Sequence, residues 1–176
     1  MPLGAGAVES FMEWDRRWTR RLNASVGVVP VRILFRMVSR LGNGALWYAL
    51  MFVLSVTQGR AGLESALRML AAGAIGLILY KLLKSSTTRP RPYKVLRGIQ
   101  AGIDPLDAFS FPSGHTLHAV AFTVVAVAYF PALATVLVPF TLLIAASRVV
   151  LGLHYPSDVL AGAAIGAGVA QAVLLV

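Results

Sequence analysis

The chain has 176 residues, of which 57% are hydrophobic and 13% are charged, and its mean hydropathy is +0.74. A soluble domain of this size could not bury so much apolar surface, so the composition indicates a membrane protein. The formal net charge of +9 suits anionic lipid or a phosphorylated substrate, and the hydrophobicity argues against nucleic acid. The sequence contains no cysteine, which excludes disulfides, a thiolate nucleophile and a thiolate metal site.

The first 25 residues are polar and basic and include two tryptophans, Trp14 and Trp18. They lack the basic-then-apolar order of a signal peptide, so we expect no cleaved targeting segment. We expect residues 1–25 to form an interfacial arm, with both tryptophans at headgroup depth. Residues 28–41 then carry arginines four apart on an apolar background. This segment is either an interfacial helix or a tilted first span with snorkelling arginines, and we favour the span.

Five apolar stretches follow, and each predicts a membrane span. They are residues 44–58, 63–83, 115–130, 132–150 and 158–176. Small residues recur along the last stretch and provide a face for close helix packing. The predicted fold is an all-α, polytopic transmembrane helical bundle of five to six spans. It forms a single membrane-embedded domain over residues 1–176, with its active site at one membrane face.

One polar, proline-rich segment interrupts the apolar pattern over residues 84–112. With the start of the next span it forms a predicted catalytic loop over residues 84–114. Because the apolar stretches on either side of this loop enter the membrane, residues 84 and 115 must lie on the same side. The chain then crosses twice, so residues 147–158 return to that side. Counting spans therefore brings three polar clusters to one membrane face.

The first cluster is Lys84, Arg91 and Pro92, with six residues between the two cations. Arginine offers a planar fork to two phosphate oxygens and lysine offers a point charge, so the pair suits a dianionic phosphate. A basic loop that touches anionic lipid headgroups would have the same composition, and the cluster alone does not separate these alternatives.

The second cluster is Pro112, Ser113, Gly114 and His115, directly before an apolar run. Ser113 can cap the following helix, Gly114 lets a ligand approach the backbone, and free N–H groups at a helix start bind phosphate oxygens. His115 would lie in the first turn, where it could donate a proton to a leaving oxygen. A simple helix cap beside an interfacial histidine explains the same residues.

The third cluster is Ser147 and Arg148, followed by His154, Pro156 and Asp158. Proline favours the start of a helix, so we expect His154 and Asp158, four residues apart, to share a face. A carboxylate that holds one imidazole nitrogen leaves the other nitrogen free as a nucleophile. A purely structural His–Asp hydrogen bond is the alternative.

Charged side chains are almost absent after Asp107, where only Arg148 and Asp158 remain. Ionisable groups near a bilayer are costly, so those that are present become functional candidates. Together the clusters supply three cations, a helix N-terminus, a nucleophile with its orienting acid, and a separate proton donor. Phosphoryl transfer through a phosphohistidine requires these groups.

The three clusters resemble the three-part signature of the type-2 phosphatidic acid phosphatase superfamily, with every signature position filled in order between residues 84 and 158. The resemblance implies that His154 is the nucleophile, that Asp158 holds it, and that His115 protonates the leaving group. It also implies a set of groups that hold the phosphoryl oxygens: Lys84, Arg91, Ser113, the Gly114 backbone and Arg148. The family needs no metal or other cofactor.

The resemblance also implies a lipid phosphate as the substrate. Small all-membrane members of the family are typically bacterial enzymes that act on undecaprenyl diphosphate, phosphatidylglycerophosphate, phosphatidic acid or lipid A. We expect this lipid and the surrounding membrane lipids as partners, with no nucleic acid, and the oligomeric state stays open. With six spans, the N-terminal arginines and Arg60 would lie opposite the motifs. The positive-inside rule would then place the active site outside the cytoplasm, on the periplasmic face of a bacterial inner membrane.

Rival functions account for part of the pattern. Two pairs, His115 with His118 and His154 with Asp158, could give zinc four ligands, but three neighbouring cations would repel a divalent metal. A transporter or lipid-binding protein could recognise phosphate without cleaving it, and a phosphotransferase could pass it to another lipid. The separate His115 argues against mere binding, which does not require a proton donor.

Several nearby residues lie outside the signature. His118 fits a satisfied helix histidine better than a substrate entrance. Three residues flank the first motif and fit a headgroup site or a solvated basic loop about equally: Arg89, Tyr93 and Lys94. We expect Asp104 and Asp107 to be solvated loop acids, because a carboxylate would repel a bound phosphate.

Overall fold

Residues 5–105 and 107–176 are described by the computed structural model, and they form eight α-helices, two 3-10 helices and no named strand. The α-helices are α1 (Ala5–Asn23), α2 (Val29–Leu41), α3 (Ala45–Thr57), α4 (Gly59–Thr87), α5 (Pro92–Val95), α6 (Gly114–Tyr129), α7 (Ala134–Val150) and α8 (Pro156–Leu175). The 3-10 helices η1 (Ala24–Gly27) and η2 (Pro131–Leu133) precede α2 and α7. The predicted all-α class is confirmed. Residues 1–4 of the predicted arm and residue 106 of the predicted loop lie outside the described residues.

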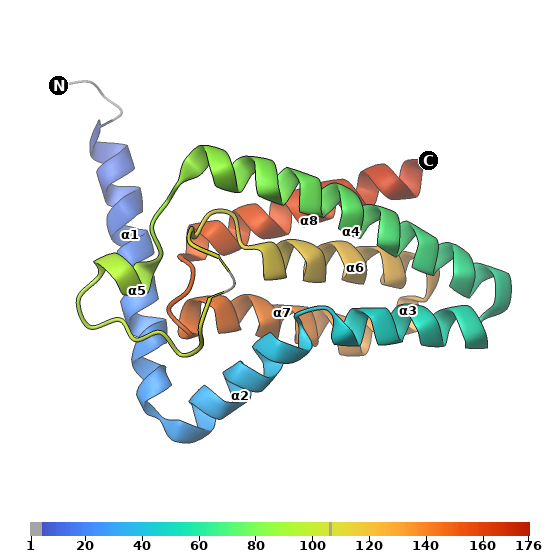
Figure 1. The fold of residues 1–176 in the computed structure, drawn as a ribbon, viewed down its shortest axis with the longest axis horizontal. Helices are drawn as coiled ribbons and strands as arrows, with labels where there is room; N and C mark the ends of the chain where they lie inside the picture. Colours follow the sequence, from blue (N-terminus) through green and yellow to red (C-terminus); the bar gives the residue numbers. More distant parts are fainter. Residues whose placement is uncertain (1–4, 106) are drawn as a thin grey trace.

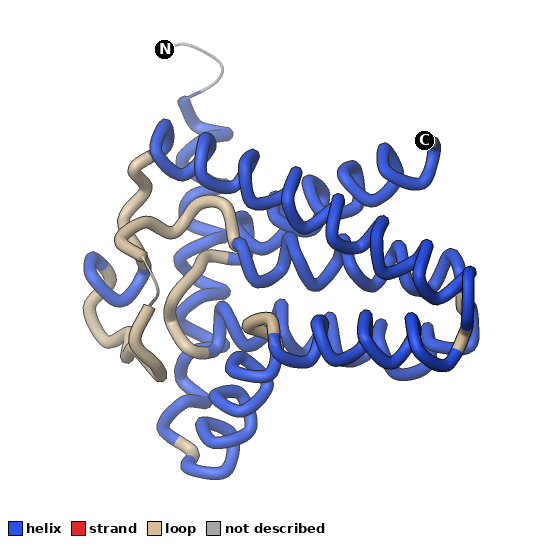
Figure 2. Tube along the Cα trace, turned by 45° about the vertical axis from the view of Figure 1, so that its right-hand side comes forward, coloured by secondary structure: helices blue, strands red, loops and turns tan. Residues whose placement is uncertain are grey.

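Helices α3, α4, α6, α7 and α8 run side by side as a bundle (Figures 1 and 2). They coincide with the five apolar stretches, because an apolar segment in lipid must satisfy its backbone polar groups within its own helix. Helix α6 packs against α4, α7 and α8, and its Leu117, Ala121 and Val125 are fully buried. The outer faces expose large apolar side chains, among them Phe52 and Leu142, as expected of a surface in contact with lipid.

The number of spans differs from the sequence-based prediction. Three segments, Gly59–Thr87, Pro131–Val150 and Pro156–Leu175, are long and apolar enough to cross a bilayer. Helices α3 and α6 are apolar but have 13 and 16 residues, about 20 and 24 Å of helix against a hydrocarbon core of about 30 Å. The predicted first span over residues 28–41 forms α2, which passes the same test only when joined to α1 across a bend of 110°. The described residues therefore hold three candidate spans, or four with the bent pair, and the count of five to six is not confirmed.

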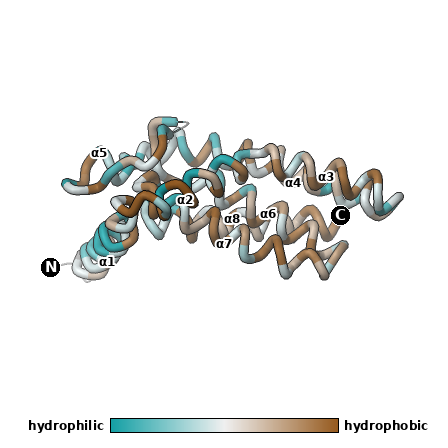
Figure 3. Tube along the Cα trace, turned by 90° about the horizontal axis from the view of Figure 1, so that it is seen from below, coloured by the Kyte–Doolittle hydropathy of each residue, from teal (hydrophilic) through white to brown (hydrophobic). Residues whose placement is uncertain are grey.

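Helix α1 lies across one end of the bundle (Figure 1). Its buried Asp15 ties it to α8, because Oδ1 of Asp15 accepts a hydrogen bond from the backbone N–H of Ser157 at 2.9 Å. Trp14 and Trp18, which are four residues apart and share a face of the helix, are exposed. Figure 3 shows α1 as mostly hydrophilic, beside the mostly hydrophobic α6, α7 and α8. An amphipathic helix in this orientation has the geometry that an interfacial arm requires.

Glycines on α8 let α6 approach closely at the end of the bundle that carries the motifs. A Cβ on Gly162 would come within 2.5 Å of the carbonyl oxygen of Ser113, and one on Gly166 would overlap the carbonyl oxygen of Leu117. The backbone N–H of Ser113 donates a hydrogen bond to the carbonyl oxygen of Asp158 at 3.0 Å. The small-residue face of α8 therefore sets the distance between the second and third motifs.

Candidate active site

The three motifs meet at one end of the bundle. Lys84 lies in the last turn of α4 and His115 in the first turn of α6. Arg148 lies in the last turn of α7, and His154 and Asp158 flank the start of α8. These helix ends all lie at the left of Figure 1, beside α1. The grouping that span counting predicted is therefore present in the structure.

His154 lies in the connection between α7 and α8 and is 2% exposed. Its Nε2 is 3.2 Å from Nη1 of Arg91, a nitrogen that also donates to the carbonyl oxygen of Leu153 at 2.8 Å. Its Nδ1 is 3.8 Å from Oδ2 of Asp158, which is too long for a hydrogen bond. The imidazole thus presents one nitrogen to a cation of the first motif and the other to a carboxylate.

The surroundings of His154 keep its ring uncharged. Burial, followed by the positive charges of Arg148, Arg91 and Lys84, holds the pKa of His154 well below its ordinary value of 6.5. A neutral imidazole has a lone pair available, which a nucleophile requires. With Nε2 accepting from Arg91, the ring proton belongs on Nδ1, the nitrogen that faces Asp158.

Asp158 is fully buried in the first turn of α8. Its Oδ2 accepts a hydrogen bond from the backbone N–H of Tyr155 at 2.8 Å, and its Oδ1 accepts one from Nη1 of Arg89 at 2.5 Å. The carboxylate that the sequence pairs with His154 is therefore fixed by its own helix start and by a loop arginine. Its Oδ2 also faces Nδ1 of His154, at 3.8 Å.

Asp107 lies between the two cations of the first motif, so the prediction of a solvated loop acid was wrong. Its Oδ1 is 2.7 Å from Nζ of Lys84 and 2.8 Å from Nη2 of Arg91, and its Oδ2 accepts from the Tyr80 hydroxyl at 2.5 Å. Burial raises the pKa of Asp107, but hydrogen bonds from Lys84 and Tyr80 and the charge of Arg91 outweigh burial and lower the pKa to about 2. The prediction considered only repulsion from a phosphate. It overlooked the mutual repulsion of Lys84 and Arg91, which a carboxylate relieves. Asp104 is exposed, as predicted.

Arg148 points into the same region from the end of α7. It is 3% exposed, and its Nη1 donates to the hydroxyl of Ser39 on α2. Its Nε is buried and has no hydrogen-bond partner among the described residues. An unpaired donor on a buried cation is costly, and an oxygen of a phosphate ligand would satisfy it.

The start of α6 differs in detail from the predicted cap. Ser113 occupies the N-cap position, but its hydroxyl lies 2.9 Å from Oγ1 of Thr116 and makes no side-chain capping bond to the backbone. The ring of Tyr80 fills the space beside Gly114, where a Cβ would come within 2.7 Å of the ring. The sequence predicts a ligand in the space beside the Gly114 backbone, and in this structure the Tyr80 ring occupies that space.

A cavity of about 460 Å³ opens beside His115, between α3, α4 and α6. Most of its walls are apolar or aromatic, including Trp47, Met51, Leu77 and Phe122. A cavity of this size and character suits part of a small organic ligand. It places an apolar space directly next to the predicted proton donor.

His118 lines the same cavity one turn beyond His115. Its Nδ1 is 2.9 Å from the carbonyl oxygen of Gly114, and its Nε2 is 3.3 Å from that of Gly73. Both ring nitrogens face helix carbonyls, and a neutral imidazole, with its single N–H, can donate to one of them. The contact with Gly114, one turn earlier on α6, fits the helix histidine expected from the sequence. Within residues 5–105 and 107–176, no three side chains of His, Asp or Glu gather as metal ligands.

Comparison with known proteins decides the family. A family model described as the PAP2 superfamily matches residues 65–176. Two lipid A 1-phosphatases are each 30% identical to the chain: that of Rhizobium johnstonii, over 83% of this chain and 68% of the relative, and that of Rhizobium etli, over 82% and 71%. The chain belongs to the PAP2 superfamily.

Solved PAP2-type structures share the arrangement of this chain. The crystal structure of Aquifex aeolicus LpxE has a TM-score of 0.80 and 26% sequence identity, covering 90% of this chain and 93% of that one. A transmembrane PAP2-type phosphatidylglycerolphosphate phosphatase from Bacillus subtilis has a TM-score of 0.74 at 23% identity, covering 94% and 85%, and supports the fold alone. These comparisons confirm the predicted family, the helical membrane fold and the prediction of a membrane lipid phosphatase.

Besides the position of Asp107, sequence reasoning missed Tyr80 and the contacts of Arg89, which it had left open between a headgroup site and a solvated loop. Tyr80 lies four residues before Lys84 and accepts a hydrogen bond from its Nζ at 3.0 Å, and the i, i+4 spacing on one helix could have revealed it. Arg89 contacts both Asp158 and Asp15, at 2.5 and 2.7 Å. No local spacing relates Arg89 to Asp15 in α1, so the sequence gave no signal for this contact.

Proposed function

We propose that this PAP2 protein hydrolyses a phosphomonoester or a pyrophosphate on a membrane lipid. The reaction passes through a phosphohistidine on His154. The observation that carries the proposal is the orientation of the His154 ring, with Nε2 3.2 Å from Arg91 and Nδ1 facing Asp158 at 3.8 Å. The low pKa of His154 supports a neutral nucleophile. Catalytic hydrogen bonds are often long before substrate binds, so the 3.8 Å separation is compatible with this role.

The first half-reaction transfers the phosphoryl group to the protein. Lys84, Arg91 and Arg148 bind its oxygens together with the backbone N–H groups at the start of α6. Nε2 of His154 attacks phosphorus and the bond to the lipid oxygen breaks. The negative charge of the bound phosphate favours the protonated form of His115. His115 then donates its proton to that oxygen, which leaves as the lipid alcohol or, from a pyrophosphate, the lipid monophosphate.

The second half-reaction releases inorganic phosphate. His115, now neutral, accepts a proton from a water molecule, whose oxygen attacks the phosphohistidine. The P–N bond breaks and the electron pair returns to Nε2 of His154. Asp158 stabilises the positive charge that the ring carries while it is phosphorylated. His115 regains its proton and the site returns to its starting state.

The substrate class follows from the position of the site. The motif end of the bundle lies beside α1, whose exposed tryptophans suit the membrane interface. The apolar cavity next to His115 can take part of a lipid. The candidate substrates are phosphatidylglycerophosphate, phosphatidic acid, undecaprenyl diphosphate and lipid A. Lipid A is the lipid named for the Rhizobium relatives.

A panel of lipid phosphates tests this proposal. Purified protein is expected to release inorganic phosphate from at least one of these lipids, and the His154→Ala variant is expected to release none. Arg97→Gln is the control, because Arg97 is exposed and lies outside the three motifs and both cavities. Unchanged release by His154→Ala would contradict the mechanism. Transfer of phosphate to an acceptor lipid would favour a phosphotransferase, and no release from any lipid would favour binding without catalysis.

We also propose that the protein resides in a bacterial inner membrane with the site on the outer face. The structure places α1 and its arginines at the motif end, so the six-span argument from those residues no longer applies. Arg60, in the first turn of α4 at the opposite end of the bundle, still fits this orientation, whereas the α1 arginines at the motif end count against it. Because the chain has no cysteine, Ala101→Cys should react with an impermeant thiol reagent in intact cells, and Gln58→Cys should react only after lysis. The reverse pattern would contradict the orientation.

A further inference from the structure

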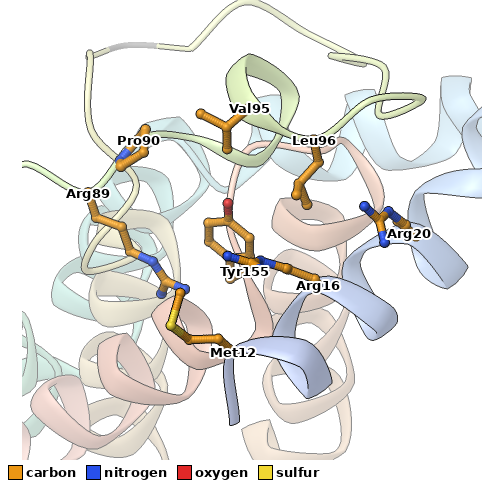
Figure 4. Close-up of a pocket in the computed structure, with 8 residues that line it drawn as sticks. All are labelled: Met12, Arg16, Arg20, Arg89, Pro90, Val95, Leu96 and Tyr155. Atoms are coloured by element: carbon orange, nitrogen blue, oxygen red, sulfur yellow. The ribbon is translucent and has the colours of Figure 1, made fainter. Parts of the chain in front are cut away.

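We infer that the protein has a second phosphate-binding site, next to the catalytic cluster, for a lipid-borne phosphate group that is not hydrolysed. The site is a cavity of about 520 Å³ between α1, the segment that follows α4, and the start of α8, within the size range of ligand pockets. Figure 4 shows Arg16 and Arg89 on either side of the Tyr155 ring, with Arg20 beside Arg16. Its apolar lining includes Met12 and Leu96.

The positive charge of this cavity is only partly compensated. Arg89 is paired with Asp15 at 2.7 Å and with Asp158 at 2.5 Å. Arg16 and Arg20 have no carboxylate within 4.0 Å in the part of the chain that the structure describes. Like charges one helical turn apart repel, and an anion between them removes that repulsion. Guanidinium groups match the oxygens of a phosphate in geometry as well as in charge.

The surroundings of the cavity favour a phosphate carried by a lipid. Helix α1 exposes Trp14 and Trp18, which suits the depth of lipid headgroups. Met12 and Leu96 offer contact to the apolar part of such a molecule. Two sources have this chemistry: a second phosphate on the lipid being dephosphorylated, and the headgroup of a neighbouring anionic phospholipid.

Shared residues connect this cavity to the proposed catalytic site. Tyr155, which lines the cavity, directly follows His154 in the chain. The guanidinium of Arg89 lies 4.0 Å from the centre of the Tyr155 ring and also binds Asp158. Tyr155 and Arg89 therefore separate this cavity from the catalytic site. A lipid with two phosphate groups can place one group in the catalytic site and the other in the cavity. For such a lipid, the inference rests on the proposed function.

The test compares two double variants that remove the same charge from α1. All four arginines are exposed, but Arg16→Gln with Arg20→Gln alters the cavity lining, and Arg17→Gln with Arg21→Gln alters residues outside it. In a neutral detergent, kcat/KM is measured on a one-phosphate lipid and on the same lipid with a second phosphate. We expect the ratio of the two values to fall by about tenfold in the cavity variant and to stay at the wild-type value in the control.

A binding measurement identifies the source of the phosphate and does not depend on catalysis. Short-chain phosphatidylglycerol is added to each protein in detergent, and the rise in unfolding temperature reports binding to the native state. If the cavity variant loses only the kinetic preference, the source is the substrate's second phosphate; if it loses only the thermal shift, the source is the phospholipid. Equal kinetic ratios and equal thermal shifts in the two double variants would overturn the inference. If wild-type protein releases no phosphate from either lipid, the proposed function fails, and the thermal shift alone decides this site.

Discussion

Arg89 donates one hydrogen bond to Oδ1 of Asp158 at 2.5 Å and another to Oδ2 of Asp15 at 2.7 Å. One loop side chain therefore joins α1 to the start of α8 next to His154. Both carboxylates are almost fully buried, with 0% and 1% exposure. Buried carboxylates depend on their counter-ion, because an unpaired charge in the interior is strongly destabilising.

Arg89→Gln should lower the free energy of unfolding by about 3 kcal/mol, because it leaves two buried carboxylates without a cation. Adding Asp15→Asn to Arg89→Gln should recover part of the loss, since one of the unpaired charges is then absent. The measurement is the unfolding temperature of the purified protein in detergent. Arg97→Gln, at an exposed position of the same loop, is the control. An Arg89→Gln variant as stable as Arg97→Gln would show that the contacts of Arg89 contribute nothing.

Asp107→Asn should increase the affinity of the site for phosphate. The Asp107 carboxylate holds Lys84 and Arg91 at 2.7 and 2.8 Å, so a phosphate that binds these cations has to displace it. We expect the inhibition constant of inorganic phosphate or vanadate to fall by about tenfold. Asp104→Asn, a change at an exposed loop acid, controls for the lost charge. A rise in the constant would mean that Asp107 positions the cations for phosphate.

The effect of Asp107→Asn should not depend on pH in the usual assay range. The pKa of Asp107 is about 2, so the carboxylate is ionised at every pH from about 5 to about 8. The ratio of the inhibition constants of wild type and variant, measured at several pH values, should therefore stay constant. A ratio that approaches one as the pH falls to about 5 would contradict the ion pairs seen here.

His154 should make the native state less stable in acid. Its folded pKa lies well below 6.5, so below that pH the unfolded chain binds a proton that the folded chain does not. The free energy of unfolding then falls with decreasing pH, by up to about 1.4 kcal/mol per unit for this group. Unfolding temperatures measured between about pH 7.5 and about pH 5.5 should decline more steeply for wild type than for His154→Asn. Parallel curves would contradict a buried neutral ring.

Gly162→Ala should disturb the contact between α6 and α8. The new Cβ would lie 2.5 Å from the carbonyl oxygen of Ser113, so the two helices must separate at the motif end. We expect a loss of about 1 to 3 kcal/mol in stability and a lower kcat. Gly168→Ala lies on the same helix with nothing within 4 Å of its Cβ, and it should be neutral or slightly stabilising. Equal effects of the two changes would exclude this packing role.

The sequence predicted the helical bundle and the convergence of the three motifs, because long apolar runs and span counting depend only on local composition. It did not predict that Asp107 occupies the space between Lys84 and Arg91, since a loop acid has no periodicity that shows where it folds. The link from Arg89 to Asp15 joins segments far apart in sequence and was invisible for the same reason. The span favoured over residues 28–41 is not confirmed: α2 is long enough to cross only when joined to α1, and its apolar composition does not reveal the bend of 110° that precedes it.

The phosphoenzyme is the most direct test of the proposed mechanism. Protein is mixed with lipid labelled with ³²P in the phosphate group and quenched within milliseconds, and the label on the protein is followed. The mechanism predicts a transient acid-labile, base-stable phosphohistidine in the peptide that contains His154, and none in His154→Asn. Phosphate release without any labelled protein, or a labelled His154→Asn variant, would contradict the assignment of His154 as the nucleophile.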